Sequence, residues 1–260
     1  MNAPVESVVL CEGYHDRAFW AGWLTERLGW TDARPRREDG TYETVRDPFG
    51  KPVIRGDFAY RAPSGRFLRV RPCHGDSQVL TFMRIRLRER TTNGLRRLVV
   101  NLDVDIDATE PNSTPRREAA IQDAVERIVA QEAPGWSRTP DGDLSLDGGA
   151  TLVSLVLWST TDPPTPELPP QQTLERLVCA ALRAAHPDRA AAVGAWLAAR
   201  RDPPPATPKE HAWSHMAGWY AAHGCDDFYH AVWRAPAVAA ELEARLRASG
   251  ALRAAAALDG

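Results

Sequence analysis

Two apolar runs of strand length, each stopped by an acidic residue, constrain the fold of this chain more than any other feature. The run VVLC at 8–11 is followed by Glu12, and the run LVVNL at 98–102 is followed by Asp103. Unbroken apolar runs of this length are typical of strands covered by helices on both faces, as in a parallel sheet. Because open α/β sheets bind ligands at the carboxyl ends of their strands, we expect polar chemistry where these runs end.

Helical periodicity alternates with the strand-like runs through the first part of the chain. After a tight turn at Gly13, the residues Phe19, Trp20 and Trp23 recur at helical spacing. Alternating strands and helices predict an α/β domain over residues 1–162, with a mainly parallel sheet flanked by helices. The expected strands are 5–11, 98–103 and 151–158, and the expected helices are 14–28, 77–91 and 115–132.

Two other segments differ in composition. Residues from about 30 to 70 are rich in Arg, Asp, Gly and Pro and predict an insertion into the domain, with a hairpin around 63–65. After the proline-rich stretch 163–170, the chain becomes Ala-rich and periodic like a set of helices. We expect this C-terminal region, 163–260, to pack on the sheet domain as helices at 171–185, 187–200, 208–223, 226–234 and 236–248.

The balance of charge offers no general attraction for a polyanion. The formal net charge is −2 at pH 7, so contact with nucleic acid would need a local basic patch. Arginine binds phosphate well, although any single arginine is more often part of a solvated helix face. The candidates for nucleic-acid binding are Arg84 and Arg88 in the helix 77–91, His74 in the turn before it, and the strand arginines Arg66, Arg69 and Arg71.

The sequence also bounds the cellular setting. No apolar run reaches the roughly 20 residues that cross a bilayer. The first residues lack the basic region and apolar stretch of a secretory signal. Cysteines are widely spaced, which is typical of reduced thiols rather than a zinc ribbon. We therefore expect a cytoplasmic protein without a membrane segment.

Five carboxylates follow the two strand-like runs. Glu12 ends the first run, and Asp16 falls in the first turn of the next helix. Asp103, Asp105 and Asp107 alternate with apolar residues, and the strand period of two predicts that all three point to one side. With both strands in one parallel sheet, these carboxylates would converge.

A converging cluster of acids requires protons or cations to neutralise it. Two like charges about 4 Å apart repel by about 4 kcal/mol at an effective dielectric constant of about 20. Oxygen ligands without a set of cysteines or histidines favour Mg²⁺ or Mn²⁺ over zinc. Magnesium sites in proteins commonly take phosphate oxygens as further ligands, so the implied substrate is a phosphate ester. Each acidic motif alone is also common as a helix cap or turn, whereas the two in this order indicate a metal site.

The segments 8–16 and 98–105 together resemble the TOPRIM domain. This is the metal-binding α/β module of type IA and type II topoisomerases, bacterial primases, small ribonucleases and overcoming-lysogenization-defect (OLD) nucleases. In that family an E-G-x-x-D glutamate and a D-x-D pair bind Mg²⁺ for phosphoryl transfer or phosphodiester cleavage. The resemblance implies that Glu12, Asp16, Asp103 and Asp105 are metal ligands, with Asp107 as a substitute.

Within the family, the chain looks most like the OLD nucleases and their stand-alone relatives. Those proteins add a glutamate at the start of a later helix and a lysine in a C-terminal helical part, which the resemblance places at Glu175 and Lys209. Lysine is rare in this chain, which has two lysines, Lys51 and Lys209, and 30 arginines. A lysine near metals can donate a proton or place a point charge on a developing phosphorane. Many OLD nucleases also carry an ATPase domain, but this sequence contains no G-x-x-x-x-G-K-[ST] motif, so the resemblance implies a separate ATPase as the partner.

These features together predict a Mg²⁺- or Mn²⁺-dependent nuclease acting on DNA or RNA. Glu12, Asp103 and Lys209 would be its catalytic residues, and Glu12, Asp16, Asp103, Asp105 and Glu175 would hold the cation. A non-catalytic TOPRIM-like module that binds nucleic acid or a partner protein is the alternative. A primase-like nucleotidyl transferase is a third interpretation, disfavoured because no zinc-binding or polymerase-like region is recognisable.

Overall fold

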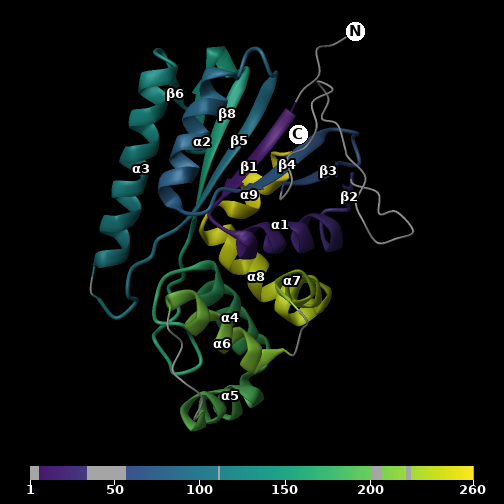
Figure 1. The fold of residues 1–260 in the computed structure, drawn as a ribbon, viewed down its shortest axis with the longest axis vertical. Coiled ribbons are helices and arrows are strands. Elements are labelled where there is room, and N and C mark those ends of the chain that lie inside the picture. The colour runs from purple at the N-terminus through teal and green to yellow at the C-terminus, as the bar shows by residue number, and fades with distance from the viewer. Residues whose placement is uncertain (1–5, 34–56, 111, 201–206, 221–223, 260) are drawn as a thin grey trace.

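A mixed eight-stranded sheet forms the centre of the molecule (Figure 1). The computed structural model describes residues 6–33, 57–110, 112–200, 207–220 and 224–259. The strand order is β2-β3-β4-β1-β5-β8-β7-β6. The central strands are parallel: β4 (Phe67–Pro72), β1 (Glu6–Cys11), β5 (Leu95–Asp103) and β8 (Thr151–Trp158). Antiparallel strands extend both edges: β2 (Thr31–Asp32), β3 (Phe58–Arg61), β6 (Ser137–Arg138) and β7 (Leu144–Leu146).

Helices cover both faces of the sheet, as the unbroken apolar strands predict. Side chains alternate along a strand, so Val8 and Leu10 join the core under α2 (Asp76–Arg88) and α3 (Ser113–Glu132). Val9 and Cys11 face the opposite core, which contains α1 (Tyr14–Glu26). The predicted α/β class with a mostly parallel sheet is confirmed.

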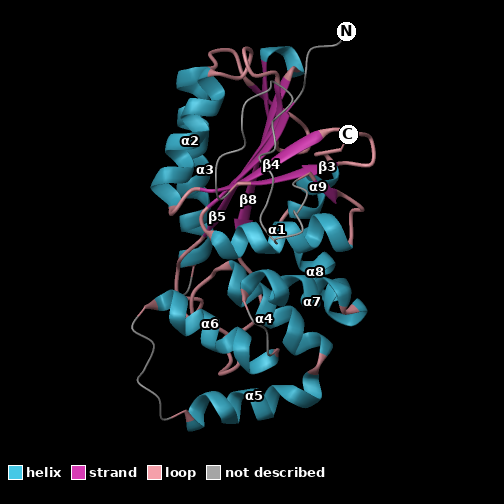
Figure 2. Cartoon of the chain, turned by 45° about the vertical axis from the view of Figure 1, so that its right-hand side comes forward, coloured by secondary structure: helices cyan, strands magenta, loops and turns pink. Residues whose placement is uncertain are grey.

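The C-terminal region is helical and lies mainly beyond the carboxyl ends of the strands, where Figures 1 and 2 both place α4, α5 and α6. The helix at Ala251–Ala256, the last in this region, was not predicted. Phe228, Tyr229 and Trp233 are fully or almost fully buried, and Tyr229 and Trp233 pack against aromatic rings of α1. The helices are α4 (Leu174–Ala185), α5 (Pro187–Ala199), α6 (Pro208–Trp219), α7 (Cys225–Arg234), α8 (Pro236–Ala248) and α9 (Ala251–Ala256).

The segment predicted as an insertion is built partly into the sheet. The hairpin around 63–65 is present, because β3 and β4 pair antiparallel across it. Its second strand, however, is also a parallel neighbour of β1. Residues 34–56 of the predicted insertion lie outside the described residues.

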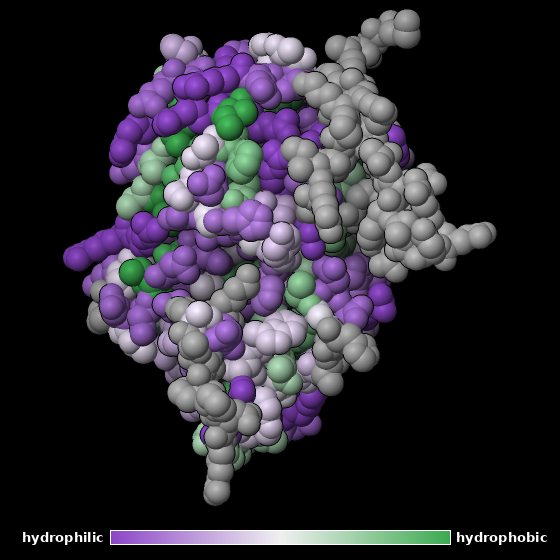
Figure 3. All heavy atoms as spheres, viewed as in Figure 1, coloured by the Kyte–Doolittle hydropathy of each residue, from purple (hydrophilic) through white to green (hydrophobic). Residues whose placement is uncertain are grey.

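The surface agrees with a core that holds most of the large apolar side chains. On the face shown in Figure 3, the described surface is mostly hydrophilic, with hydrophobic residues in small separate groups. Within the described ranges, no helix is both long and apolar enough to cross a membrane.

Candidate carboxylate site

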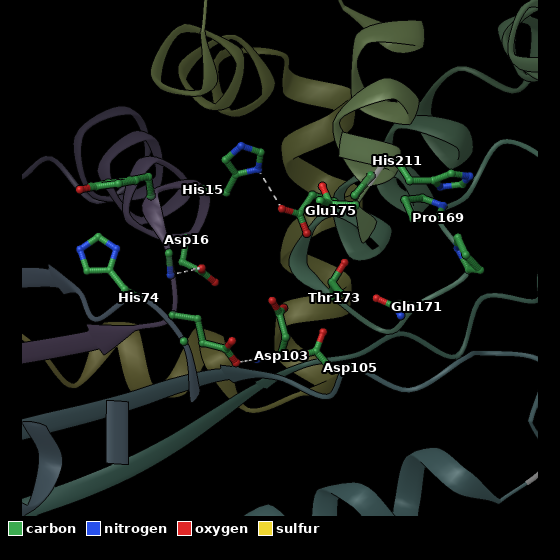
Figure 4. Close-up of a pocket in the computed structure, with 17 residues that line it drawn as sticks. His15, Asp16, His74, Asp103, Asp105, Pro169, Gln171, Thr173, Glu175 and His211 are labelled. Carbon is green, nitrogen blue, oxygen red and sulfur yellow. Dashed lines mark hydrogen bonds and ion pairs between the residues drawn. The ribbon is translucent and has the colours of Figure 1, made fainter. Parts of the chain in front are cut away.

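A pocket of about 670 Å³ lies where the sheet meets the helical region. Its volume is within the range of about 300–1,000 Å³ that is usual for ligand sites. One wall comes from the loops after β1 and β4, and the other comes from the segment before α4 and from the start of α6. Figure 4 shows Asp16, Asp103, Asp105 and Glu175 around this common space.

Asp16 is held by two donors that fix its position in the pocket. Gly13 donates its backbone N–H to Asp16 Oδ2 at 3.0 Å, which caps α1. Trp158 at the end of β8 donates its indole N–H to Oδ1 at 2.8 Å. The backbone of Gly13 is extended, with φ −142°, so the turn uses its N–H rather than the conformational freedom of glycine. Asp16 is therefore both a helix cap and a pocket residue.

Asp103 and Glu12 are joined directly across neighbouring strands. The Asp103 backbone N–H donates to Glu12 Oε1 at 2.7 Å. The Asp103 carboxylate accepts the backbone N–H of Leu174, the first residue of α4, at 2.8 Å. The N-terminus of α4 thus points at the carboxylate of Asp103. The positive end of the helix dipole stabilises negative charge at this position.

The predicted alternation of Asp103, Asp105 and Asp107 is wrong beyond the first residue. The strand ends at Asp103, and Asp105 has a left-handed backbone with φ +54°. This reversal breaks the strand period, yet Asp105 still lines the pocket. Asp107 is not among the lining residues, and its carboxylate accepts the N–H and hydroxyl of Thr109 instead. Asp107 therefore caps a local turn.

Glu175 reaches the site because the chain after β5 is fastened to the segment before α4. Asp105 N–H donates to the Gln172 carbonyl at 3.0 Å, and Gln172 N–H donates to the Ile106 carbonyl at 2.8 Å. This pairing sets α4 beside the ends of β1 and β5. Glu175, in its first turn, is 8% exposed and lines the pocket.

His15 is a pocket residue that the sequence analysis missed. Its Nδ1 lies 2.8 Å from Glu175 Oε1, and its ring packs edge-on against Trp213 and Tyr229. An ionised carboxylate can only accept, so Nδ1 carries the proton in this contact. The sequence signal that could have identified His15 is its position directly before Asp16 within the E-G-x-x-D motif.

The electrostatics of the cluster follow from burial and crowding. Burial, aided by the charge of Asp16, raises the pKa of Glu12 to about 8. Burial and the charge of Glu175 raise the pKa of Asp16 to about 6. The same two causes raise the pKa of Asp105, and burial with the charge of Asp16 holds the pKa of Asp103 well above its usual range. Most of this cluster therefore resists ionisation without a counter-charge.

Glu175 behaves differently from the other acids. Burial is the largest single influence and opposes its charged form, but the hydrogen bond and charge of His15, together with the backbone N–H of Glu175 itself, outweigh burial and lower the pKa of Glu175. The His15–Glu175 pair is thus the part of the cluster best able to hold a negative charge.

The donor chemistry of the pocket fits a hard divalent cation, since carboxylate oxygens predominate. Among the described residues, no group of three His, Cys, Asp or Glu side chains is arranged so that it could hold a metal ion. Glu12 and Asp103 each already use one carboxylate oxygen on a backbone N–H.

The predicted nucleic-acid residues divide into two groups. His74 lines the pocket. Arg84 and Arg88 do not, because they face α3, where both form ion pairs with Glu132. The strand residues Arg69 and Arg71 are buried in ion pairs with Glu6 and Asp57 respectively. These two strand arginines are structural, so predicting them as surface phosphate ligands was wrong.

Lys209 is in the first turn of α6, and its side chain lies outside the described residues. Its neighbours Thr207, His211 and Ala212 line the pocket. The backbone of α6 therefore begins at the wall opposite the sheet.

Comparison with known proteins supports the fold. No protein-family model matches the chain, and no curated protein matches it in sequence. The crystal structure of a hypothetical protein from Pyrococcus horikoshii OT3 is similar, with a TM-score of 0.62 and 16% sequence identity. The match covers 98% of this chain and 100% of that one. The sheet and the C-terminal helices together are thus one fold shared with another protein.

Proposed function

We propose that this chain is a Mg²⁺- or Mn²⁺-dependent phosphodiesterase of the TOPRIM type that cleaves nucleic acid at the carboxylate pocket. The proposal is carried by one observation. Glu12, Asp103 and Glu175, from three separated parts of the sequence, line one pocket at the carboxyl ends of parallel strands. The raised pKa values of Glu12 and Asp103 support it, because a cation would relieve the charge that the fold concentrates there.

Each residue has a defined part in this proposal. Glu12, Asp16, Asp103, Asp105 and Glu175 would hold the cation, with His15 orienting Glu175. A cation bound there would neutralise the phosphate and lower the pKa of a water that attacks it. Lys209 would add a positive charge from α6. We place this activity in the cytoplasm, with a separate ATPase as a candidate partner.

A matched pair of aspartates tests the proposal. Purified protein should cleave plasmid or single-stranded DNA or RNA when Mn²⁺ is added, and EDTA should stop the cleavage. Asp103→Ala should lower the rate by at least about 100-fold, as loss of a central electrostatic contact does. Asp107→Ala, four residues away and outside the pocket, should cleave like the parent. Equal cleavage by Asp103→Ala and the parent would refute the assignment.

A second function is favoured by the arrangement of the side chains. Because no three described side chains already form a metal-holding group, the pocket also suits a module that binds nucleic acid or a partner protein without cutting it. Tight binding with no cleavage in Mg²⁺, Mn²⁺ or Ca²⁺ would favour this module over the nuclease.

A further inference from the structure

Tyr14 keeps an aromatic ring exposed at the pocket. It is the first residue of α1 and is 43% exposed, whereas Phe19 and Trp20 of the same helix are fully buried. Tyr14 lines the same pocket as the carboxylates. A large ring left in water beside a buried polar site is available for contact with a ligand.

The surroundings of Tyr14 hold its ring in place. His74 meets it edge-on, with ring centroids 5.2 Å apart, and the Arg17 guanidinium carbon lies 4.8 Å from its centroid. His74 itself has a left-handed backbone with φ +67°, and its N–H donates to the Glu12 carbonyl at 2.7 Å. Backbone strain of this kind clusters at functional sites. The loop after β4 is therefore fastened to the end of β1, next to the Tyr14 ring.

The depth of the carboxylates limits what can reach them. Asp16 and Glu175 are only 4% and 8% exposed, and walls from the sheet loops and from α6 stand on both sides of them. A phosphate must enter this pocket to meet the acids. In a duplex the bases are paired and stacked on one another, so none of them offers a free face to the Tyr14 ring beside the pocket. An unpaired base, in contrast, has a free face for an aromatic ring.

We propose that Tyr14, braced by His74 and Arg17, stacks on an unpaired base next to the phosphate at the carboxylate pocket, so that the substrate is single-stranded nucleic acid. This inference rests on the proposed function, since it assumes that the pocket receives a phosphodiester.

The test compares oligonucleotides that differ in bases but not in charge. Fluorescence anisotropy with the full chain in Ca²⁺ would measure binding of a labelled dT 12-mer, its duplex with dA, and a 12-mer of abasic residues. The parent should bind the dT strand more tightly than the other two. Stacking on one ring predicts that Tyr14→Ala weakens dT binding about 5- to 100-fold and leaves abasic binding unchanged. Tyr14→Phe, which keeps the ring, should bind like the parent.

Two controls separate failure of this inference from failure of the proposed function. Thermal unfolding and a calorimetric Mn²⁺ titration should be alike for Tyr14→Ala and the parent, which shows that fold and carboxylates are intact. If Tyr14→Ala still prefers dT to the abasic strand, or if the parent binds duplex as tightly as single strand, the stacking role is refuted, although Asp103-dependent cleavage can stand. Absence of both binding and cleavage would overturn both.

Discussion

At the scale of single residues, the acids of the pocket combine local structural roles with a shared electrostatic one. Asp16 caps α1 and receives the Trp158 indole N–H, and Asp103 receives the first N–H of α4. These bonds hold the carboxylates in place, while burial and mutual repulsion raise most of their pKa values. These side chains therefore both fix the local structure and line the pocket.

The raised pKa of Glu12 predicts how stability depends on pH in the metal-free protein. Folding raises this pKa from 4.5 to about 8, so the folded state binds the proton more tightly than the unfolded state. The stabilising contribution is complete below about pH 4.5 and is lost as the pH rises through about 8. In EDTA, the melting temperature should fall across this window.

Glu12→Gln isolates the contribution of this carboxyl. Glutamine cannot ionise but can still accept the Asp103 N–H, so the variant should melt higher than the parent at pH 8 and show a shallower pH slope. Asp123→Asn, at an exposed position of α3 outside the pocket, is the matched control. A slope as steep in Glu12→Gln as in the parent would contradict the prediction.

At the scale of elements, the segment between β8 and α4 decides whether the site is complete. Arg176 of α4 is fully buried and donates to the backbone carbonyls of Pro169 and Asp162. These bonds hold the 162–170 segment against the helix whose first turn carries Glu175. The position of Glu175 thus depends on a buried guanidinium that does not line the pocket.

Replacing that guanidinium should be costly. Arg176→Leu leaves two carbonyls without their charged donor, and we expect the free energy of unfolding to fall by about 2–4 kcal/mol in urea titrations. Arg183→Leu on the same helix breaks only a long ion pair with Glu167, 3.7 Å from Nε to Oε2, in which Arg183 is 39% exposed, and should cost less than about 1 kcal/mol. Similar losses for the two variants would show that the segment is held by other contacts.

At the scale of the whole molecule, the helical region docks on the sheet domain through α1 and α7. Gly22 of α1 has no space for a side chain, because a Cβ there would lie 2.9 Å from both Trp233 Cδ1 and the Tyr229 carbonyl oxygen. A backbone atom cannot move aside as a side-chain end can. This close approach joins the domain that carries Glu12 and Asp16 to the helices that carry the opposite wall.

The same substitution at two helical glycines should therefore have opposite effects. Gly22→Ala should destabilise the protein by about 1–3 kcal/mol through overpacking. At Gly194 of α5 the nearest atom is the flexible Glu167 carboxylate, at 3.0 Å, so Gly194→Ala should stabilise by about 0.5–1 kcal/mol through helix propensity. Urea unfolding measures both, and stabilisation by Gly22→Ala would contradict the close docking.

Much of the fold was readable from local pattern. The apolar runs and helical periods located the central strands and most helices to within a few residues, because burial of a strand or a helix face imposes its own period on the sequence. The short α9 was missed since six Ala-rich residues carry little periodicity. The role of β4 was also missed, because strand pairing depends on partners that are distant in the chain.

What the sequence determined by itself was the class of fold and the acidic strand ends at Glu12 and Asp103. The tertiary structure decided which acids share a pocket: it excluded Asp107 through a left-handed turn at Asp105, and it added His15 through its contact with Glu175. The physical reason is range. Periodicity records whether a residue faces core or water, whereas convergence depends on backbone pairing and helix docking between segments up to 160 residues apart.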